Sequence, residues 1–220
     1  MLFRSNKIGG WTGAGTLGTN TFGARFYGPL PGKVNLSLEG IGQGGHMGPL
    51  TQRAFAGFAG LSRRVTFLNR PLNLSIEYKL ASGTKAGSTN SGTYDQIGAS
   101  NHDKFGHQDL FGWRNLRTVR SVESWSITKT FAWNVMYTDQ RLYSAADSLY
   151  SSPGTAISTS KNGSAGTHVG QELDTYATYA HGPYVFGAGF GHFFKGEFVS
   201  HTTPNINPRY FYVFQQYSFK

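Results

Sequence analysis

The chain has 220 residues, with 17 Phe, 12 Tyr, 4 Trp and 30 Gly but no Cys, and its formal net charge is +9. Charged residues make up only 14% of it, against about 25% in soluble domains, and no run of about 18 apolar residues exists, which excludes a transmembrane helix. The positive charge favours polyanionic partners such as lipid head groups or acidic polysaccharide, whereas the absence of a basic run, zinc-ligand spacing or a ribonucleoprotein motif argues against nucleic acid.

Alternating apolar and polar residues predict strands through the first third of the chain. Residues 1–18 read as loop, and 72–81 is the clearest strand, with Leu74 and Ile76 on one face and Glu77 and Lys79 on the other. The remaining predictions here are strands at 21–27, 33–42 and 53–61, separated by a turn at 28–32, a glycine-rich loop at 42–52 and a basic turn at 62–71.

The same pattern continues after a long connection at 82–116. Strands are predicted at 117–128, 131–142, 168–179, 184–193 and 210–219, with long loops at 143–167 and 194–208. The last strand is rich in aromatic residues. It is typical of the closing strand of an outer-membrane barrel, although a core strand of a soluble β-sandwich would show the same alternation.

The order of short turns and long loops favours the barrel. Short connections alternate with long ones, as in an up-and-down meander whose long loops all lie at one end. We therefore expect an all-β fold, an antiparallel up-and-down transmembrane β-barrel of an outer membrane, spanning residues 1–220 as one region whose strands occupy 19–219. The count is about nine strands, and since single-chain barrels close on even numbers, we expect a partial barrel.

A partial barrel needs further strands, because open sheet edges are not tolerated in lipid. These strands would come from a missing half of the barrel or from another copy. The first ten residues lack the apolar segment of a secretory signal peptide, which leads us to expect a fragment or a processed chain.

Several segments carry a resemblance to a known family. They are 78–83 (YKLASG), 93–96 (TYDQ), 100–115 (SNHDKFGHQDLFGWRN), 169–174 (VGQELD) and 193–196 (FFKG). In order and spacing they resemble the C-terminal half of the barrel in the alginate-export family of outer-membrane porins, over most of 72–219. The resemblance implies passive transport of an anionic solute, an alginate-like polyuronate, with no enzymatic reaction and no cofactor.

Charged residues on the polar strand faces are the candidate pore lining, because Arg or Lys on a lipid face costs ~2–4 kcal/mol at the membrane midplane. The set is Arg25, Glu39, Glu77, Lys79, Arg120, Glu172 and Asp174. The three cations would form a path for an anionic polymer, as charged rings do in other pores. Alternatively, they pair with the acidic residues and hold the wall rigid. A register slip of one residue would turn Arg120 outward and Arg117 and Glu123 inward.

The long connection holds the second candidate group, assigned to an extracellular loop: His102, Asp103, His107, Asp109, Trp113 and Arg114. Imidazole and carboxylate groups this close are metal-ligand types, but their spacing matches no helical zinc motif. We therefore predict no metal site. The segment is expected to pack with Phe105 and Phe111 as an ordered extracellular lid.

An outer-membrane enzyme or adhesin acting through the long loops is the alternative function. Asp139 lies near the expected barrel rim, where some small barrels carry catalytic carboxylates. However, the chain contains no Gly-x-Ser-x-Gly elbow, and the glycines of 42–48 are not followed by the Lys-Ser/Thr of a phosphate-binding loop.

Overall fold

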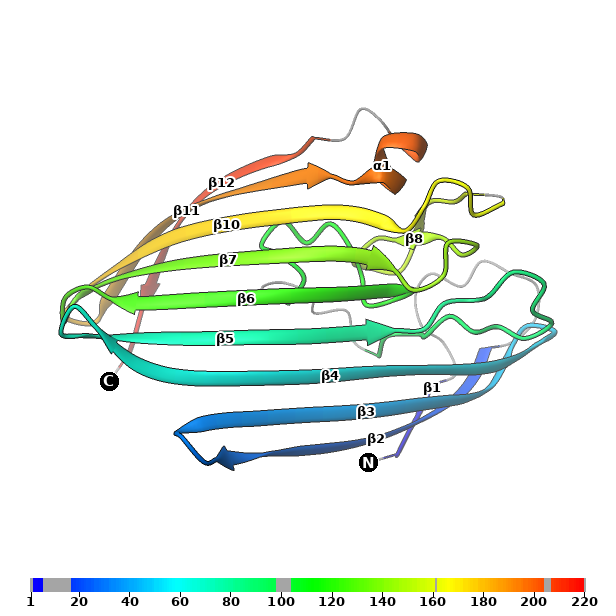
Figure 1. Ribbon diagram of the computed structural model, residues 1–220, viewed down its shortest axis with the longest axis horizontal. Helices are drawn as coiled ribbons and strands as arrows, with labels where there is room; N and C mark the ends of the chain where they lie inside the picture. The colour runs from blue at the N-terminus through cyan, green and yellow to red at the C-terminus, as the bar shows by residue number, and fades with distance from the viewer. Residues whose placement is uncertain (1, 6–16, 98–103, 161, 204–206, 220) are drawn as a thin grey trace.

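The computed structural model describes residues 2–5, 17–97, 104–160, 162–203 and 207–219. Its main feature is one antiparallel sheet of ten strands, in which chain neighbours pair in the order β1 to β7, then β10, β11 and β12 (Figure 1). These strands are β1 (Leu2–Ser5), β2 (Leu17–Leu30), β3 (Val34–Met47), β4 (Leu50–Phe67), β5 (Arg70–Ala81), β6 (Leu116–Ser126), β7 (Phe131–Leu142), β10 (His168–His181), β11 (Tyr184–Lys195) and β12 (Arg209–Tyr217).

The long connections all lie at one end of the sheet. The turn end carries only the short links after β2, β4, β6 and β10, and the loop end carries the long links after β5, β7 and β11 together with the two-residue link after β3, which was expected to be long (Figure 1). The link after β7 contains the small hairpin of β8 (Leu149–Tyr150) and β9 (Ala156–Ser158), and the link after β11 contains α1 (Glu197–Thr202). The expected all-β meander with its long loops at one end is therefore confirmed.

Three local predictions were wrong. Leu2–Ser5 forms a short strand where a loop was expected, and pairs with β2. The glycine-rich stretch 42–52 is not a loop: β3 continues to Met47, and Gly48, at φ 58°, opens a two-residue turn into β4. Glycine has low strand propensity, but pairing with β2 on one side and β4 on the other keeps this stretch in the sheet.

The basic stretch 62–71 is also strand rather than turn. β4 runs to Phe67, and only Leu68 and Asn69 form the turn, with φ values of 48° and 57°. Two successive positive φ angles define the type I′ turn, whose twist matches that of a hairpin. The charges of Arg63 and Arg64 therefore lie on a strand, one on each face.

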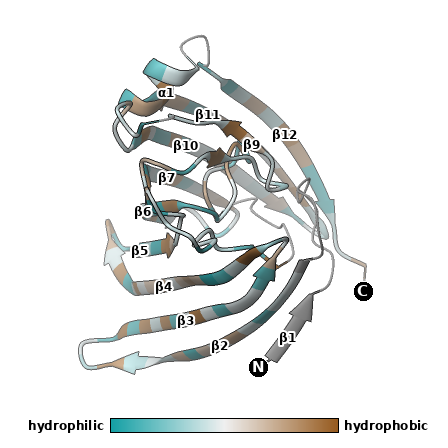
Figure 2. Ribbon diagram, turned by 90° about the vertical axis from the view of Figure 1, so that its right-hand side faces the viewer, coloured by the Kyte–Doolittle hydropathy of each residue, from teal (hydrophilic) through white to brown (hydrophobic). Residues whose placement is uncertain are grey.

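The sheet is curved, and its two faces differ. Figure 2 shows the long connections lying on the concave side, which we call the inner face. The register fixes which side chains share this face: one inner row runs across eight strands. From β2 to β11 this row consists of Arg25, Glu39, Phe58, Lys79, Thr118, Gln140, Gly170 and Lys195.

The outer face is apolar at mid-strand and aromatic near the turn end. Ile76 is 53% exposed and Val213 is 72% exposed. Near the turn end Phe67 packs edge-on against Trp125, with ring centroids 5.4 Å apart, and Tyr184 lies 5.0 Å from Tyr217. An apolar band bordered by aromatic side chains is the surface that a membrane-spanning sheet presents to lipid.

The largest buried cluster lies not between two sheets but between the inner face and the connections at the loop end. Phe193 and Leu142 of the wall pack there with Phe105 and Phe111 of the first long connection and with Phe198 of α1. Among the residues that the structure describes, no helix is long and apolar enough to span a membrane. The sheet has β1 and β12 as its two edges within the same residues.

Because the two faces of the wall differ, an arginine should cost far more stability at an outward position of β5 than at the inward position beside it. Ile76→Arg should lower the unfolding free energy of the protein in lipid vesicles by roughly 2–4 kcal/mol, because it places a charge against lipid at mid-strand. Ser75→Arg, on the inner face of the same strand, is the matched control and should cost much less. Denaturant titration followed by tryptophan fluorescence measures both; equal losses would contradict the assignment of faces.

Candidate functional site

All seven charged strand residues singled out from the sequence lie on the inner face, as the pairing register requires. The register ambiguity is also resolved: Arg120 pairs with inner-facing Glu77, whereas Arg117 and Glu123 face outward opposite Leu80 and Leu74. The charges nevertheless differ in their surroundings, and they fall into three groups.

The first group is an ion-paired cluster at the centre of the wall. The Glu77 carboxylate accepts from Lys79 Nζ at 2.8 Å and from Arg120 Nη1 at 3.1 Å. Arg120 Nη2 also lies 3.0 Å from Met136 Sδ. Both cations are nearly buried. In this cluster the charges hold neighbouring strands together, which is the structural alternative weighed above.

The second group is a buried pair of carboxyls on β10, Glu172 and Asp174, which are 0% and 1% exposed. They accept hydrogen bonds from the backbone of the connection 82–115: His107 N donates to Asp174 Oδ2 at 3.2 Å and Gln108 N to Glu172 Oε1 at 3.1 Å. Gly106, at φ 111°, leaves room for the Glu172 carboxyl, with which a Cβ would collide. These two acids therefore anchor a loop rather than face open space.

We call residues 82–115 the inward loop, because its described part is bound to the inner face. Lys79 Nζ donates to the carbonyl of Lys104 at 2.6 Å, and Gln140 Nε2 donates to that of Phe105 at 2.8 Å. Side chains of the wall thus satisfy backbone groups of a segment that has no secondary structure of its own, as buried backbone requires.

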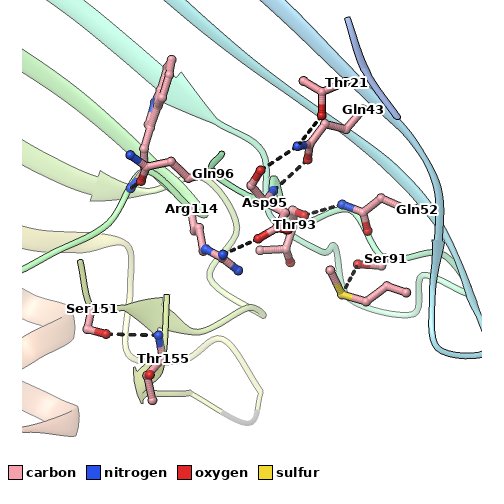
Figure 3. Close-up of polar contacts among 12 residues, drawn as sticks. Thr21, Gln43, Gln52, Ser91, Thr93, Asp95, Gln96, Arg114, Ser151 and Thr155 are labelled. Atoms are coloured by element: carbon pink, nitrogen blue, oxygen red, sulfur yellow. Dashed lines mark hydrogen bonds and ion pairs between the residues drawn. The ribbon is translucent and has the colours of Figure 1, made fainter. Parts of the chain in front are cut away.

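Two glutamines hold the first part of the inward loop in the same way (Figure 3). Gln43 exchanges two hydrogen bonds with the backbone of Asp95, at 2.6 and 2.8 Å. Gln52 Nε2 donates to the carbonyl of Thr93 at 2.7 Å. The loop is therefore tied to β3 and β4 at one side and to β10 at the other, and it crosses the inner face between them.

A buried ion pair closes the loop on itself: Arg114 Nη2 contacts Asp95 Oδ1 (Figure 3). Burial raises the pKa of the Asp95 carboxyl above its usual range, while the Arg114 guanidinium opposes that rise. Burial also raises the pKa of the adjacent Tyr94 hydroxyl to about 12. Asp95 thus depends on its partner to carry a charge in this position.

The other loop residues predicted from the sequence are placed as follows. His107 Nδ1 lies 2.6 Å from the Tyr212 hydroxyl of β12, and Trp113 N donates to Gln96 Oε1 at 3.0 Å. Asp109 adopts a positive φ of 52°. His102 and Asp103 lie outside the described residues. The described part packs against the wall, and Phe105 and Phe111 are buried there in one cluster, with Trp113 packed against it. That the segment forms an extracellular lid stays a prediction.

Metal ligands and the rim carboxylate were also considered from the sequence. Within the described ranges no group of three His, Cys, Asp or Glu side chains is placed to hold a metal ion. Asp139 faces outward and accepts from Arg141 Nε at 2.9 Å, and it lies 3.0 Å from His168 Nε2. It is therefore separated by the sheet from the acids of the inner face.

The third group of charges borders an open hollow. A cavity of about 550 Å³ lies on the inner face of β2 to β5 toward the turn end, lined by Arg25, Tyr27, Phe58 and Glu77 among others. Arg25 is exposed there, with its guanidinium 5.7 Å from the Tyr27 ring centre, and half-buried Glu39 lies opposite it in the register. Arg64, not selected from the sequence because its segment was assigned to a turn, is likewise exposed on this face.

Sequence reasoning missed the side chains that bind the inward loop, chiefly Gln43, Gln52 and Gln140. For Gln43 and Gln140 the signal is their position on the polar side of an alternating strand, whereas Gln52 shares its face with Ala54 and Ala56 and carries no such signal. What the sequence does not contain is the identity of their partners, because these are backbone groups 52, 41 and 35 residues away.

An all-antiparallel wall, apolar outside and charged inside, with its longest loop folded against the inner face, defines a porin-type transmembrane β-barrel fold. The family model for alginate export matches residues 5–213. The chain therefore belongs to the alginate-export family, whose members are outer-membrane porins, and the resemblance noted from the sequence is confirmed. No curated protein gives a significant match.

The buried pair predicts a pH-dependent defect. Arg114→Ala leaves the Asp95 carboxylate buried without its partner and should destabilise the inward loop by about 3–5 kcal/mol. Because burial raises the folded-state pKa of Asp95, the unpaired group is tolerated better when protonated, so the defect should shrink as the pH falls through that pKa.

Limited proteolysis of the inward loop across a pH series measures this defect. Arg114→Ala combined with Asp95→Asn is the control, since it removes the buried charge and should recover part of the protection at neutral pH. A defect equal at every pH, or unchanged by Asp95→Asn, would contradict the argument.

Proposed function

We propose that this protein conducts anionic solutes passively along the inner face of its barrel, and that an alginate-like polyuronate is the solute. The observation that carries the proposal is the unequal burial of the inner charges. Glu172 and Asp174 are covered by the inward loop, whereas Arg25 and Arg64 are exposed.

The other two acids of the inner face, Glu77 and Glu39, are each close to a cation, which further favours positive over negative charge on the exposed surface. Glu77 is shared between Lys79 and Arg120, and Glu39 is half-buried directly opposite Arg25. A solute moving along the open part of the inner face therefore meets guanidinium groups more readily than carboxylates. The net charge of the whole chain is +9, which has the same sign as the exposed charge of the inner face.

Guanidinium groups suit this solute chemically. Each uronate unit carries one carboxylate, and arginine binds carboxylates through two parallel N–H donors. Exposed, solvated ion pairs are weak, and weak binding at successive sites is what conduction requires, since a solute must also leave each site.

Conduction across a membrane also requires a closed wall. The edges β1 and β12 carry backbone groups that lipid cannot satisfy, so we propose that further strands, of the same polypeptide or of a second copy, pair with them. Transport then needs no reaction and no cofactor, and concentration and electrostatics supply the driving force.

Neutralising the exposed cations tests the proposal. Arg25→Gln combined with Arg64→Gln should shift the reversal potential of the protein in planar bilayers toward cation permeation, with the largest effect at low salt because exposed charges are screened at high salt. Arg63→Gln, on the outer face of the same strand as Arg64, is the matched control. Unchanged selectivity in the double variant, or an equal shift in the control, would contradict the proposal.

A further inference from the structure

Three aromatic side chains stand at alternate positions on the inner face of β12: Tyr210, Tyr212 and Phe214. The Tyr210 and Tyr212 ring centroids are 5.2 Å apart with planes inclined by 27°. Those of Tyr212 and Phe214 are 6.3 Å apart and inclined by 19°. We call these three residues the aromatic ladder; it follows β12 from the loop end toward the turn end.

The ladder lies over a strip of backbone without side chains. Tyr212 is paired in register with Gly189, and Phe214 with Gly187. A Cβ added at either glycine would fall within its partner's ring. Each of these two rings therefore covers the backbone of β11 on the inner face of the sheet.

The outer two rings of the ladder are more exposed than the central one. Tyr210 and Phe214 are each 38% exposed. Tyr212 is half-buried, and its hydroxyl lies 2.6 Å from His107 Nδ1 of the inward loop. The His107 ring in turn lies 5.3 Å from that of Tyr176 on β10. The central ring is thus held in place by both the wall and the loop.

We propose that the aromatic ladder is a stacking surface for the sugar rings of a polysaccharide chain. A pyranose ring presents a face of C–H groups, and the face of an aromatic ring is electron-rich and apolar, so the two stack while the sugar hydroxyls stay in water. Rings repeated along one strand would contact successive sugar units of a chain lying parallel to β12.

This inference deepens the proposed function and rests on it. The two proposals differ in their physical basis, because stacking on the ladder does not depend on the charge of the sugar, whereas binding to the arginines does. The arginines would select for carboxylates in a salt-dependent manner, whereas the ladder would hold neutral and acidic sugars alike with little salt dependence. This difference separates the two proposals experimentally.

A purely structural role for the ladder must be distinguished as well, since aromatic side chains stabilise strand pairs by covering glycines. Replacement by leucine separates the roles, because leucine still covers Gly189 and Gly187 but offers no aromatic face. The test variant is Tyr212→Leu with Phe214→Leu. Phe211→Leu, on the outer face of the same strand, is the matched control.

The measurement is the block of ion current in planar bilayers by a uronate oligosaccharide and by a neutral β-1,4-linked oligosaccharide of equal length. Both should block the unmodified protein. In the double-leucine variant, residence times of both sugars should fall by roughly two- to tenfold for each lost ring, to the same extent at low and high salt, while selectivity between small ions is unchanged. The control should resemble the unmodified protein.

Two results would overturn the inference. If the neutral oligosaccharide does not block the unmodified protein, stacking is absent, and this result stands even if the variant fails to fold. If the double-leucine variant binds both sugars with unchanged residence times, the rings serve packing alone. In either case anion selectivity that depends on Arg25 and Arg64 would leave the proposed function intact.

Discussion

The constraint on which the whole structure depends is that adjacent residues of each strand face different solvents. In lipid every backbone polar group must be paired within the sheet, so the wall is fixed and only the side chains vary. The register puts Glu77, Lys79 and Arg120 on the inner face and leaves apolar residues such as Ile76 and Val213 exposed outside. Some charges also face outward, among them Arg63, Glu123 and Asp139. Because the period is two, a slip of one residue would exchange the faces. The position of every charge discussed above follows from that register.

The inward loop determines what the inner charges do. Side chains of β3, β4, β5, β7 and β10 bind its backbone directly. Groups used in this way are not open to other partners on the inner face. Glu172 and Asp174, which seem from the sequence to offset the cations, are instead covered by the loop. These two acids thus hold the loop, whereas the arginines Arg25 on β2 and Arg64 on β4 are exposed on the inner face, where the proposed solute path runs. The loop also contacts Tyr212, so that one segment links the charged and aromatic parts of the same surface.

The sequence was sufficient for what depends on local alternation. It predicted the meander and the shared face of Glu77 and Lys79, because alternation can be read from residues two apart. The face of Arg120, which a one-residue slip left open, is fixed only by its pairing with Glu77. The sequence failed where composition and pattern disagree: the glycines around Gly44 and the arginines around Arg63 look like loop residues, yet pairing with neighbouring strands makes them strand. It could not place the inward loop, because contacts such as His107 with Tyr212 join residues 105 positions apart. Side chain to backbone hydrogen bonds leave no pattern in the sequence at that distance.

Cysteine accessibility along β5 tests the central claim most directly, namely that the two faces of the wall contact lipid and water respectively. The chain contains no cysteine, so single cysteines placed at positions 72 to 76 can be labelled without background. In lipid vesicles, a membrane-impermeant thiol reagent should modify positions 73 and 75 and spare 72, 74 and 76. Equal modification of neighbouring positions, or modification of 74 and 76 alone, would contradict the assignment of faces and with it the solute path.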